Sequence, residues 1–382
     1  MEALPASPVE RIIRGEAFDF FRGRVALYAL LEVMGVGPGD EVIIQAFTCL
    51  AVPAPILAIG AIPVYVDAAP GSLNMDPAAV EVAITGKTRA IIVQHSFGVP
   101  GELESLLSIA RRHDLYLIED CAHTLAATYD DRPVGTFGHA AFHSYEWGKP
   151  VITGLGGTAL LNDKALNEKM AAVARRFGSG PWRQTVLVNA QYAAFRMIVG
   201  SSLYWSIRDA YRYLARLGLT VGSFSNEEMV GLASPDYRRR MAPMLRRRLV
   251  RKLRTLEHDT ARRDRLAAKL SLELKLRGFR LPLVQPRVHP VYIKFPVYVG
   301  NKGQLIERAR RDHIELYDMF VTPIHPLPPG DWARVGYRTG SCPIAESLSA
   351  QIVSIPMHAR MTAGRMGRIL EYLAVHAEPI SV

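Results

Sequence analysis

Four side chains near the middle of the chain have the types and the order that amine–carbonyl chemistry requires. An apolar run ends at Asp120, His123 follows, and Ser144 then precedes a single lysine, Lys149. A lysine can form a Schiff base with an aldehyde, a carboxylate can keep a ring nitrogen protonated, and a serine can donate to a phosphate. The pattern therefore predicts a pyridoxal phosphate site with Lys149 and Asp120 as catalytic residues. For any single lysine, the competing interpretation is an ordinary surface residue.

Further cofactor contacts are predicted around these residues. Gly23 and Arg24 open a predicted helix, and free backbone N–H groups at a helix start bind phosphate well. Gly23 allows close approach, Arg24 adds positive charge, and Ser144 donates its hydroxyl hydrogen. His123 is placed to lie against the cofactor ring or its phenolic oxygen.

The elements that must position these residues alternate between strands and helices in the first half of the chain. Continuous apolar runs predict buried strands, and spaced apolar residues predict helices between them. This alternation indicates a mainly parallel sheet with helices on both faces, whose sites lie beyond the carboxyl ends of the strands. Asp67, His95 and Asp120 are at such ends, and His95 is a predicted substrate-binding residue. The predicted strands cover residues 41–47, 63–67, 89–95, 115–120, 140–145 and 157–163, and the helices 25–36, 52–61 and 102–113.

The pattern changes after residue 176, where an aromatic-rich, apolar stretch interrupted by arginines covers about 177–228. We interpret it as a helical, partly amphipathic insertion in a large domain that spans residues 1–242. It could pack on its own subunit, on a dimer partner, or on an anionic membrane surface. Residues 243–382 predict a smaller α+β domain with a long basic helix, a strand segment at 287–299 and a helix-turn-helix-like tail.

Charge and composition limit the classes of protein. The net charge of +10 is compatible with nucleic acid, an anionic membrane or phosphorylated substrates. The arginine-rich run at 238–265 has almost no aromatic residues, which disfavours binding of single-stranded nucleic acid by stacking, and a solvated helix face is the simpler interpretation. We expect no nucleic-acid partner. Three scattered cysteines predict neither disulfides nor a metal site, and we expect a cytoplasmic protein, with peripheral contact at the inner face of the membrane as a further option.

Several segments resemble the DegT/DnrJ/EryC1/StrS family of sugar aminotransferases. They include IEDCAH, SYEWGK and the terminal block CPIAE…SIPMH, and the likeness covers most of the chain outside the insertion. The resemblance implies an α/β aspartate-aminotransferase-like fold (pyridoxal phosphate fold type I) and a homodimer with sites at the subunit boundary. It also implies L-glutamate as donor and a keto-sugar, usually nucleotide-linked, as acceptor.

The same resemblance assigns roles to individual residues. Asp120 matches the ring-nitrogen carboxylate, Ser144 the phosphate serine, Lys149 the lysine bound to the cofactor, and His325 a histidine near the sugar. His123 takes the usual Gln or His position.

Three features depart from the family pattern. Cys49 stands where an aromatic residue often covers the cofactor face, with Leu50 and Phe47 nearby. Arg238 stands where an asparagine usually reaches the partner subunit's cofactor phosphate, and an arginine can also bind phosphate. The insertion is the third departure. A cyclitol, an aromatic precursor or a lipid-linked sugar therefore stays open as the acceptor, and a catalytically inactive binding or regulatory homologue is the alternative of a different class.

Overall fold

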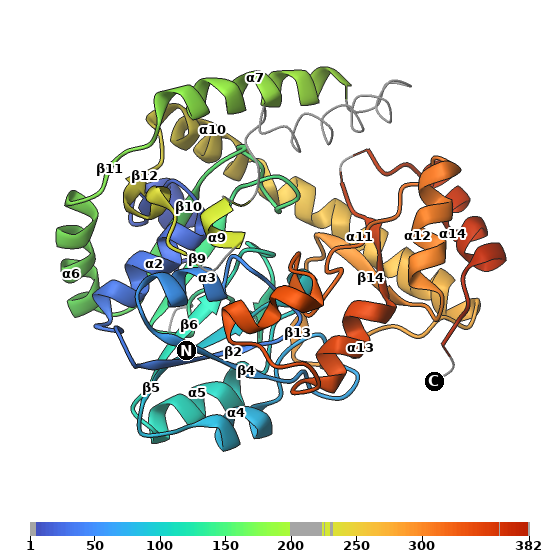
Figure 1. The fold of residues 1–382 in the computed structure, drawn as a ribbon. Coiled ribbons are helices and arrows are strands. Elements are labelled where there is room, and N and C mark those ends of the chain that lie inside the picture. The colour runs from blue at the N-terminus through green and yellow to red at the C-terminus, as the bar shows by residue number, and fades with distance from the viewer. Residues whose placement is uncertain (1–4, 199–223, 225, 230–231, 359, 381–382) are drawn as a thin grey trace.

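A computed structural model describes residues 5–198, 224, 226–229, 232–358 and 360–380. Its centre is a nine-stranded sheet in which β4, β2, β5, β6 and β9 are parallel, while β10 and β1 are antiparallel to their neighbours (Figure 1). The strand order is β11 (Gly178–Ser179), β12 (Arg239–Arg240), β1 (Phe18–Phe20), β10 (Gly157–Leu161), β9 (Ala140–Ser144), β6 (Tyr116–Asp120), β5 (Thr88–Gln94), β2 (Glu41–Gln45) and β4 (Ile62–Val66). The mainly parallel α/β sheet predicted from the apolar runs is confirmed.

Helices cover both faces of this sheet. Side chains alternate along a strand, so Val42 and Ile44 of β2 face one cluster of buried apolar residues and Ile43 faces another. The first cluster includes α2 (Gly23–Val33), and the second includes α5 (Leu103–Arg112). The first face also carries α3 (Pro53–Ala58) and α6 (Lys164–Arg175), and the second carries α4 (Pro77–Ala83).

The small domain is built on two antiparallel strands, β14 (Lys294–Tyr298) and β16 (Ile352–Pro356). Its helices are α11 (Leu256–Leu276), α12 (Lys302–Arg311) and α14 (Ala363–His376), which share one buried apolar cluster with these strands. The tail predicted as helix-turn-helix is instead a helix, α13 (Pro343–Gln351), followed by the strand β16 and then by α14.

The packing favours a domain boundary later than residue 242. The helix α10 (Pro243–Leu253) buries Leu245, Leu249 and Leu253 against the large domain, in one cluster with α1 (Pro8–Arg14). The predicted long basic helix is thus two helices, and only α11 enters the small-domain core.

A further buried cluster joins the two domains. It contains β3 (Thr48–Cys49), which pairs in parallel with β15 (Ile324–His325) from the second half of the chain. Asp67, at the end of β4, accepts hydrogen bonds from the first backbone N–H groups of α13 and so fixes that helix on the large domain. The remaining short elements are β7 (Thr128–Tyr129), β8 (Arg132–Pro133), β13 (Val288–His289), η1 (Ser96–Gly98), η2 (Pro235–Arg238) and η3 (Pro329–Val335).

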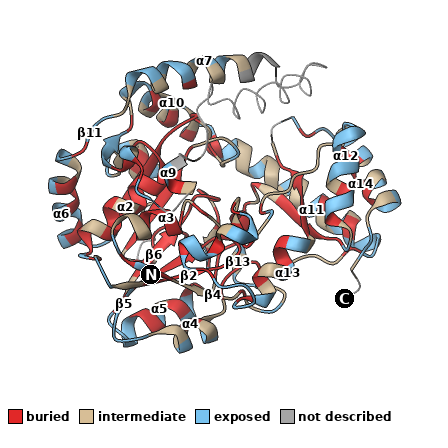
Figure 2. Cartoon of the chain, in the orientation of Figure 1, coloured by how far each residue is buried: buried red, intermediate tan, exposed pale blue. Residues whose placement is uncertain are grey.

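The predicted insertion begins with the short strand β11, and the helical character that we predicted for it is present in the described residues that follow. It holds α7 (Trp182–Ile198) and α9 (Asn226–Met229), and most of the predicted membrane-facing stretch lies outside the described residues. Figure 2 shows α7 as mainly exposed and half-buried, in contrast to the buried sheet. Among the described helices, none is both long enough and apolar enough to cross a bilayer.

Candidate active site

The carboxyl ends of β6 and β9 bring together the residues predicted as the catalytic centre. Asp120 ends β6 and is 4% exposed, and its Oδ1 accepts a hydrogen bond of 2.9 Å from the N–H of Ala122. Burial raises the pKa of Asp120, while the positive charge of Lys149 acts in the opposite direction. The carboxylate and the lysine thus occupy one site, and a cationic ring placed between them would compensate the buried charge.

Lys149 lies in the loop that follows β9 and is half-buried. Glu146, in the same loop, pairs with Arg22 at 3.0 Å and with Arg24 at 3.8 Å, at the start of α2. The backbone N–H of Lys149 donates to the carbonyl of Glu146 at 3.3 Å. Glu146, which sequence reasoning missed, therefore anchors the lysine loop to the helix that faces it.

The start of α2 forms a cradle with Ser144. A Cβ added to Gly23 would lie 2.8 Å from the Cβ and 3.2 Å from the Oγ of Ser144, so only glycine allows this approach. The N-cap residue Arg22 makes no side-chain cap hydrogen bond, which leaves the first turn of α2 open to an anion. Gly23 and Ser144 are thus brought together as predicted.

Arg24 has a different setting from the predicted one. Its side chain is 4% exposed and pairs with Glu228 at 2.7 Å, in addition to Glu146. Burial opposes the charge, but the two carboxylates hold the pKa of Arg24 above its ordinary value. Tyr237 donates to the second oxygen of Glu228 at 3.2 Å. The side chain therefore fixes α9 against α2, and only the backbone of Arg24 remains at the cradle.

His123 is buried and neutral. Burial lowers its pKa well below the usual value, and the charges of Lys149 and Lys294 lower it further. Its Nδ1 accepts a hydrogen bond of 3.3 Å from the N–H of Phe97, which assigns the ring hydrogen to Nε2. His123 can therefore donate from Nε2 to an oxygen acceptor in the site. Phe97 holds this position in a left-handed backbone conformation, with φ of 59°.

Cys49 and His325 come from distant parts of the chain and are register partners in the β3–β15 pair. The N–H of Leu50 donates to the carbonyl of His325 at 2.7 Å, which fixes the loop of the histidine on the large domain. Burial lowers the pKa of His325 to about 4, and Lys294, Lys302 and Lys149 add to this effect. Burial also raises the pKa of the Cys49 thiol, and the positive charge of Lys149 lowers it in part. Both predicted residues thus lie near the lysine.

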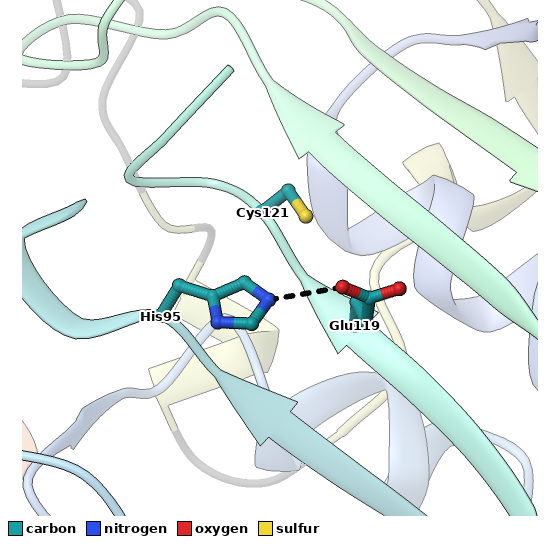
Figure 3. A group of neighbouring side chains, drawn as sticks. All are labelled: His95, Glu119 and Cys121. Carbon is teal, nitrogen blue, oxygen red and sulfur yellow. Dashed lines mark hydrogen bonds and ion pairs between the residues drawn. The ribbon is translucent and has the colours of Figure 1, made fainter. Parts of the chain in front are cut away.

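His95 is fully buried and lies beside Glu119 and Cys121 (Figure 3). Its Nδ1 accepts from the N–H of Gly101 at 3.2 Å, so its Nε2 carries the hydrogen that faces Glu119 Oε2 at 3.3 Å. Because no part of the His95 side chain is exposed, a substrate cannot contact it, and the structure argues against the predicted substrate contact.

The same three side chains are spaced for a metal ion, but the donor atoms of His95 and Glu119 are already hydrogen-bonded. Glu119 accepts from the backbone N–H groups of Gly135, Phe137 and Gly138 at 2.6–2.9 Å. Burial acts to raise the pKa of Glu119, but His95 and these N–H groups keep this pKa below its ordinary value. The pKa of the Cys121 thiol, in contrast, is raised by burial. We interpret the cluster as a structural lock on the turn after β8.

Arg238 lies on the outside of the molecule. It is exposed, and the hydroxyl of Tyr28 raises its pKa. Its predicted contact is with the phosphate of a second subunit and stays a prediction. Phe47 is fully buried and packs on Phe320 with ring centroids 4.9 Å apart, so it supports the domain junction and not the cofactor face.

The residues at this edge fit pyridoxal phosphate. The Gly23–Ser144 cradle suits a phosphate, the buried carboxylate of Asp120 suits a protonated ring nitrogen, and Nε2 of His123 suits a phenolic oxygen. Lys294 is an additional site residue that sequence reasoning missed, and the only available signal was a lysine inside an apolar strand segment.

Comparisons with known proteins agree with this geometry. A sequence model of the DegT/DnrJ/EryC1/StrS aminotransferase family matches residues 17–201 and 206–374. The chain is 29% identical over 361 residues to the dTDP-3-amino-3,4,6-trideoxy-alpha-D-glucose transaminase of Streptomyces venezuelae, which covers 94% of this chain and 82% of that protein. The chain is also 44% identical to the L-glutamine:2-deoxy-scyllo-inosose aminotransferase of Micromonospora echinospora over 147 residues, which cover 38% of this chain and 35% of that protein.

Solved structures show the same fold. DesV of S. venezuelae, solved in complex with a ketimine intermediate, has a TM-score of 0.75 and 25% sequence identity, over 99% of this chain and 91% of DesV. The aspartate-aminotransferase-like architecture predicted from the sequence is thereby confirmed. The chain belongs to the DegT/DnrJ/EryC1/StrS aminotransferase family.

Proposed function

We propose that this protein uses pyridoxal phosphate to move an amino group from an amino-acid donor, L-glutamate or L-glutamine, to the keto group of a sugar. The observation that carries the proposal is the grouping of Lys149, Asp120 and His123 beside the Gly23–Ser144 cradle. When bound, pyridoxal phosphate supplies an electron sink that makes the proton on the donor α-carbon removable.

Each residue has a role that its setting supports. The amine of Lys149 would hold the cofactor covalently, and its Nζ would carry the proton to and from the substrate carbon. Asp120 would keep the ring nitrogen protonated, and Nε2–H of His123, left available by the hydrogen bond at Nδ1, would donate to the phenolic oxygen. Ser144 and the first N–H groups of α2 bind the phosphate.

The absorbance spectrum of purified protein, before and after addition of the donor, tests this proposal. We expect a visible cofactor band that L-glutamate or L-glutamine bleaches, and that Lys149→Ala lacks. Lys164→Ala, at an exposed lysine of α6, serves as the control and keeps the band. Wild-type protein that shows no band after reconstitution with pyridoxal phosphate would contradict the proposal and favour a binding or regulatory role.

The acceptor has two supported classes. A nucleotide-linked keto-sugar agrees with the relative from S. venezuelae and with the net charge of +10. A cyclitol ketone is the second candidate, because the more similar 147-residue stretch matches an enzyme named for a cyclitol. The two classes can be distinguished by the acceptor half-reaction. Protein whose visible band has been bleached by the donor is mixed with a compound of each class, and only the true acceptor should restore the band at a rate compatible with turnover.

A further inference from the structure

A second lysine, Lys294, lies in the candidate active site. It is the first residue of β14, and the segment before it is fixed on the large domain. The N–H of Ile293 donates to the carbonyl of Phe97 at 3.1 Å. The N–H of Val291 donates to the carbonyl of Gly98, also at 3.1 Å. The two backbones are so close that a Cβ added to Gly98 would lie 2.1 Å from the carbonyl oxygen of Val291. These contacts hold Lys294 near the loop that orients His123.

The ammonium group of Lys294 has no hydrogen-bond or ion-pair partner among the described residues. It lies over the ring of Tyr317, whose centroid is 4.5 Å from Nζ. Lys302, on the neighbouring α12, provides a contrast. Its Nζ donates to the carbonyls of Phe320 and Ser349, at 2.9 and 2.5 Å, and pairs with Asp318. The Lys302 amine is thus saturated by protein groups, whereas the half-buried Lys294 amine is open to a ligand.

The surroundings of Lys294 explain why an anion would be favourable there. Burial and the positive charge of Lys149 together lower its pKa to about 8, and Asp318 offsets this effect only in part. Beyond Tyr317, Glu315 is already hydrogen-bonded by the phenol. The charged and titratable groups that surround Lys294 are Lys149, His123, His325, Asp318, Tyr317 and Glu315.

We propose that Lys294 binds the α-carboxylate of the amino donor while the donor reacts at Lys149. This assignment rests on the proposed function. The α-carboxylate is bonded to the carbon that loses its amine, so it must lie close to Lys149, and Lys294 is close enough for the two lysine charges to interact. The phosphates of a nucleotide-linked acceptor are separated from its keto carbon by the sugar ring. Lys294 could bind a carboxylate on the acceptor through the same ionic hydrogen bond. The experiment below distinguishes the two ligands, because it measures the donor half-reaction without acceptor.

The experiment measures the donor half-reaction alone, by the loss of the cofactor band in rapid mixing without acceptor. We expect Lys294→Gln to raise the half-saturating donor concentration by about tenfold or more, with a limiting rate near that of the wild type, because a charged hydrogen bond is lost. Lys294→Met repeats the test with a side chain that suits the half-buried site. Lys275→Gln, at an exposed lysine of α11, is the control and leaves the half-saturation unchanged.

The pH dependence of donor affinity gives a readout that a purely structural role would not change. Because the ammonium form of Lys294 is lost as pH rises through about 8, wild-type affinity for the donor should fall above that pH. In Lys294→Gln this fall should be absent, and Lys294→Arg should shift it to higher pH.

The outcomes separate this assignment from the proposed function. A wild type that responds to the donor, beside a Lys294→Gln variant with unchanged half-saturation, overturns the assignment alone. A change confined to the acceptor half-reaction also overturns it and points to an acidic acceptor. A wild type that binds no cofactor, or does not respond to any donor, overturns the proposed function and this assignment with it.

Discussion

Asp120 shows how burial turns a common side chain into a specialised one. At the surface this carboxylate would be screened by water, but at the end of β6 it is 4% exposed and its charge needs a partner. In the proposed function, a protonated ring nitrogen supplies that partner, and the carboxylate in return keeps the nitrogen protonated.

We therefore expect Asp120→Asn to retain the fold and to bind cofactor, but to slow the donor half-reaction by about 100-fold or more, because the amide cannot hold the ring proton. Rapid-mixing absorbance measures the rate. Glu257→Gln, at an exposed carboxylate of α11, is the matched control. A rate for Asp120→Asn within a few-fold of the wild type would remove Asp120 from the proposed mechanism.

His143, next to Ser144, is buried and, within the described part of the chain, neither of its ring nitrogens has a hydrogen-bond partner. Burial lowers its pKa to about 3, so the folded protein keeps it neutral. In the unfolded chain the imidazole of His143 takes up a proton near pH 6.5, whereas in the folded chain it stays neutral at that pH. His143 thus lowers stability as pH falls from about 6.5 towards 3, by roughly 1.4 kcal/mol per pH unit.

Urea unfolding at several pH values tests this expectation. His143→Leu should reduce the slope of unfolding free energy against pH in this window, whereas His258→Leu, at an exposed position of α11, is the control. Equal slopes in the His143 variant and the wild type would mean that the histidine is protonated in the folded state.

At the scale of elements, the site depends on how closely the start of α2 approaches β9. Gly23 and Ser144 touch because neither a Cβ nor a side-chain cap fills the space between the helix and the strand. The Glu146 ion pairs then hold the lysine loop against the same helix start. The proposed phosphate binding and the placement of the lysine therefore depend on the same packing contact.

Gly23→Ala should weaken cofactor binding by about tenfold or more, because the new methyl group displaces Ser144 or the helix start. The dissociation constant of pyridoxal phosphate, from equilibrium titration of the apo-protein, measures the effect. Gly367→Ala is a suitable control, since that helix position in α14 has nothing within 4 Å of the added Cβ. Equal weakening in both variants would assign the effect to general destabilisation.

At the scale of the whole molecule, two domains meet at the site and bring lysine and histidine side chains to its second side. The β3–β15 pair carries His325, and β14 carries Lys294. The ring of Phe320 lies between the domains, 4.9 Å from Phe47 and 6.0 Å from His325 by ring centroids. In the proposed function, the small domain therefore supplies the substrate contacts and the large domain holds the cofactor.

A homodimer with shared sites remains a prediction that mixing can test. If Arg238 reaches the cofactor phosphate of the partner subunit, Arg238→Ala and Lys149→Ala should each be impaired alone. Subunits of the two variants, mixed and allowed to exchange, should then recover about a quarter of wild-type activity, since half of the dimers contain one intact site. No recovery after demonstrated subunit exchange would place Arg238 outside the partner's site.

The sequence by itself determined the sheet and the centre of the site. Buried parallel strands are continuous apolar runs, so β2, β5 and β6 were predictable, and Asp120 and Lys149 lie close together along the chain at one sheet edge. The tertiary structure alone decided the rest. The partners of Arg24, the enclosed position of His95 and the presence of Lys294 depend on contacts between segments far apart in sequence. Local patterns report which face of an element is buried, but not which distant side chain meets it, because that choice is made by packing.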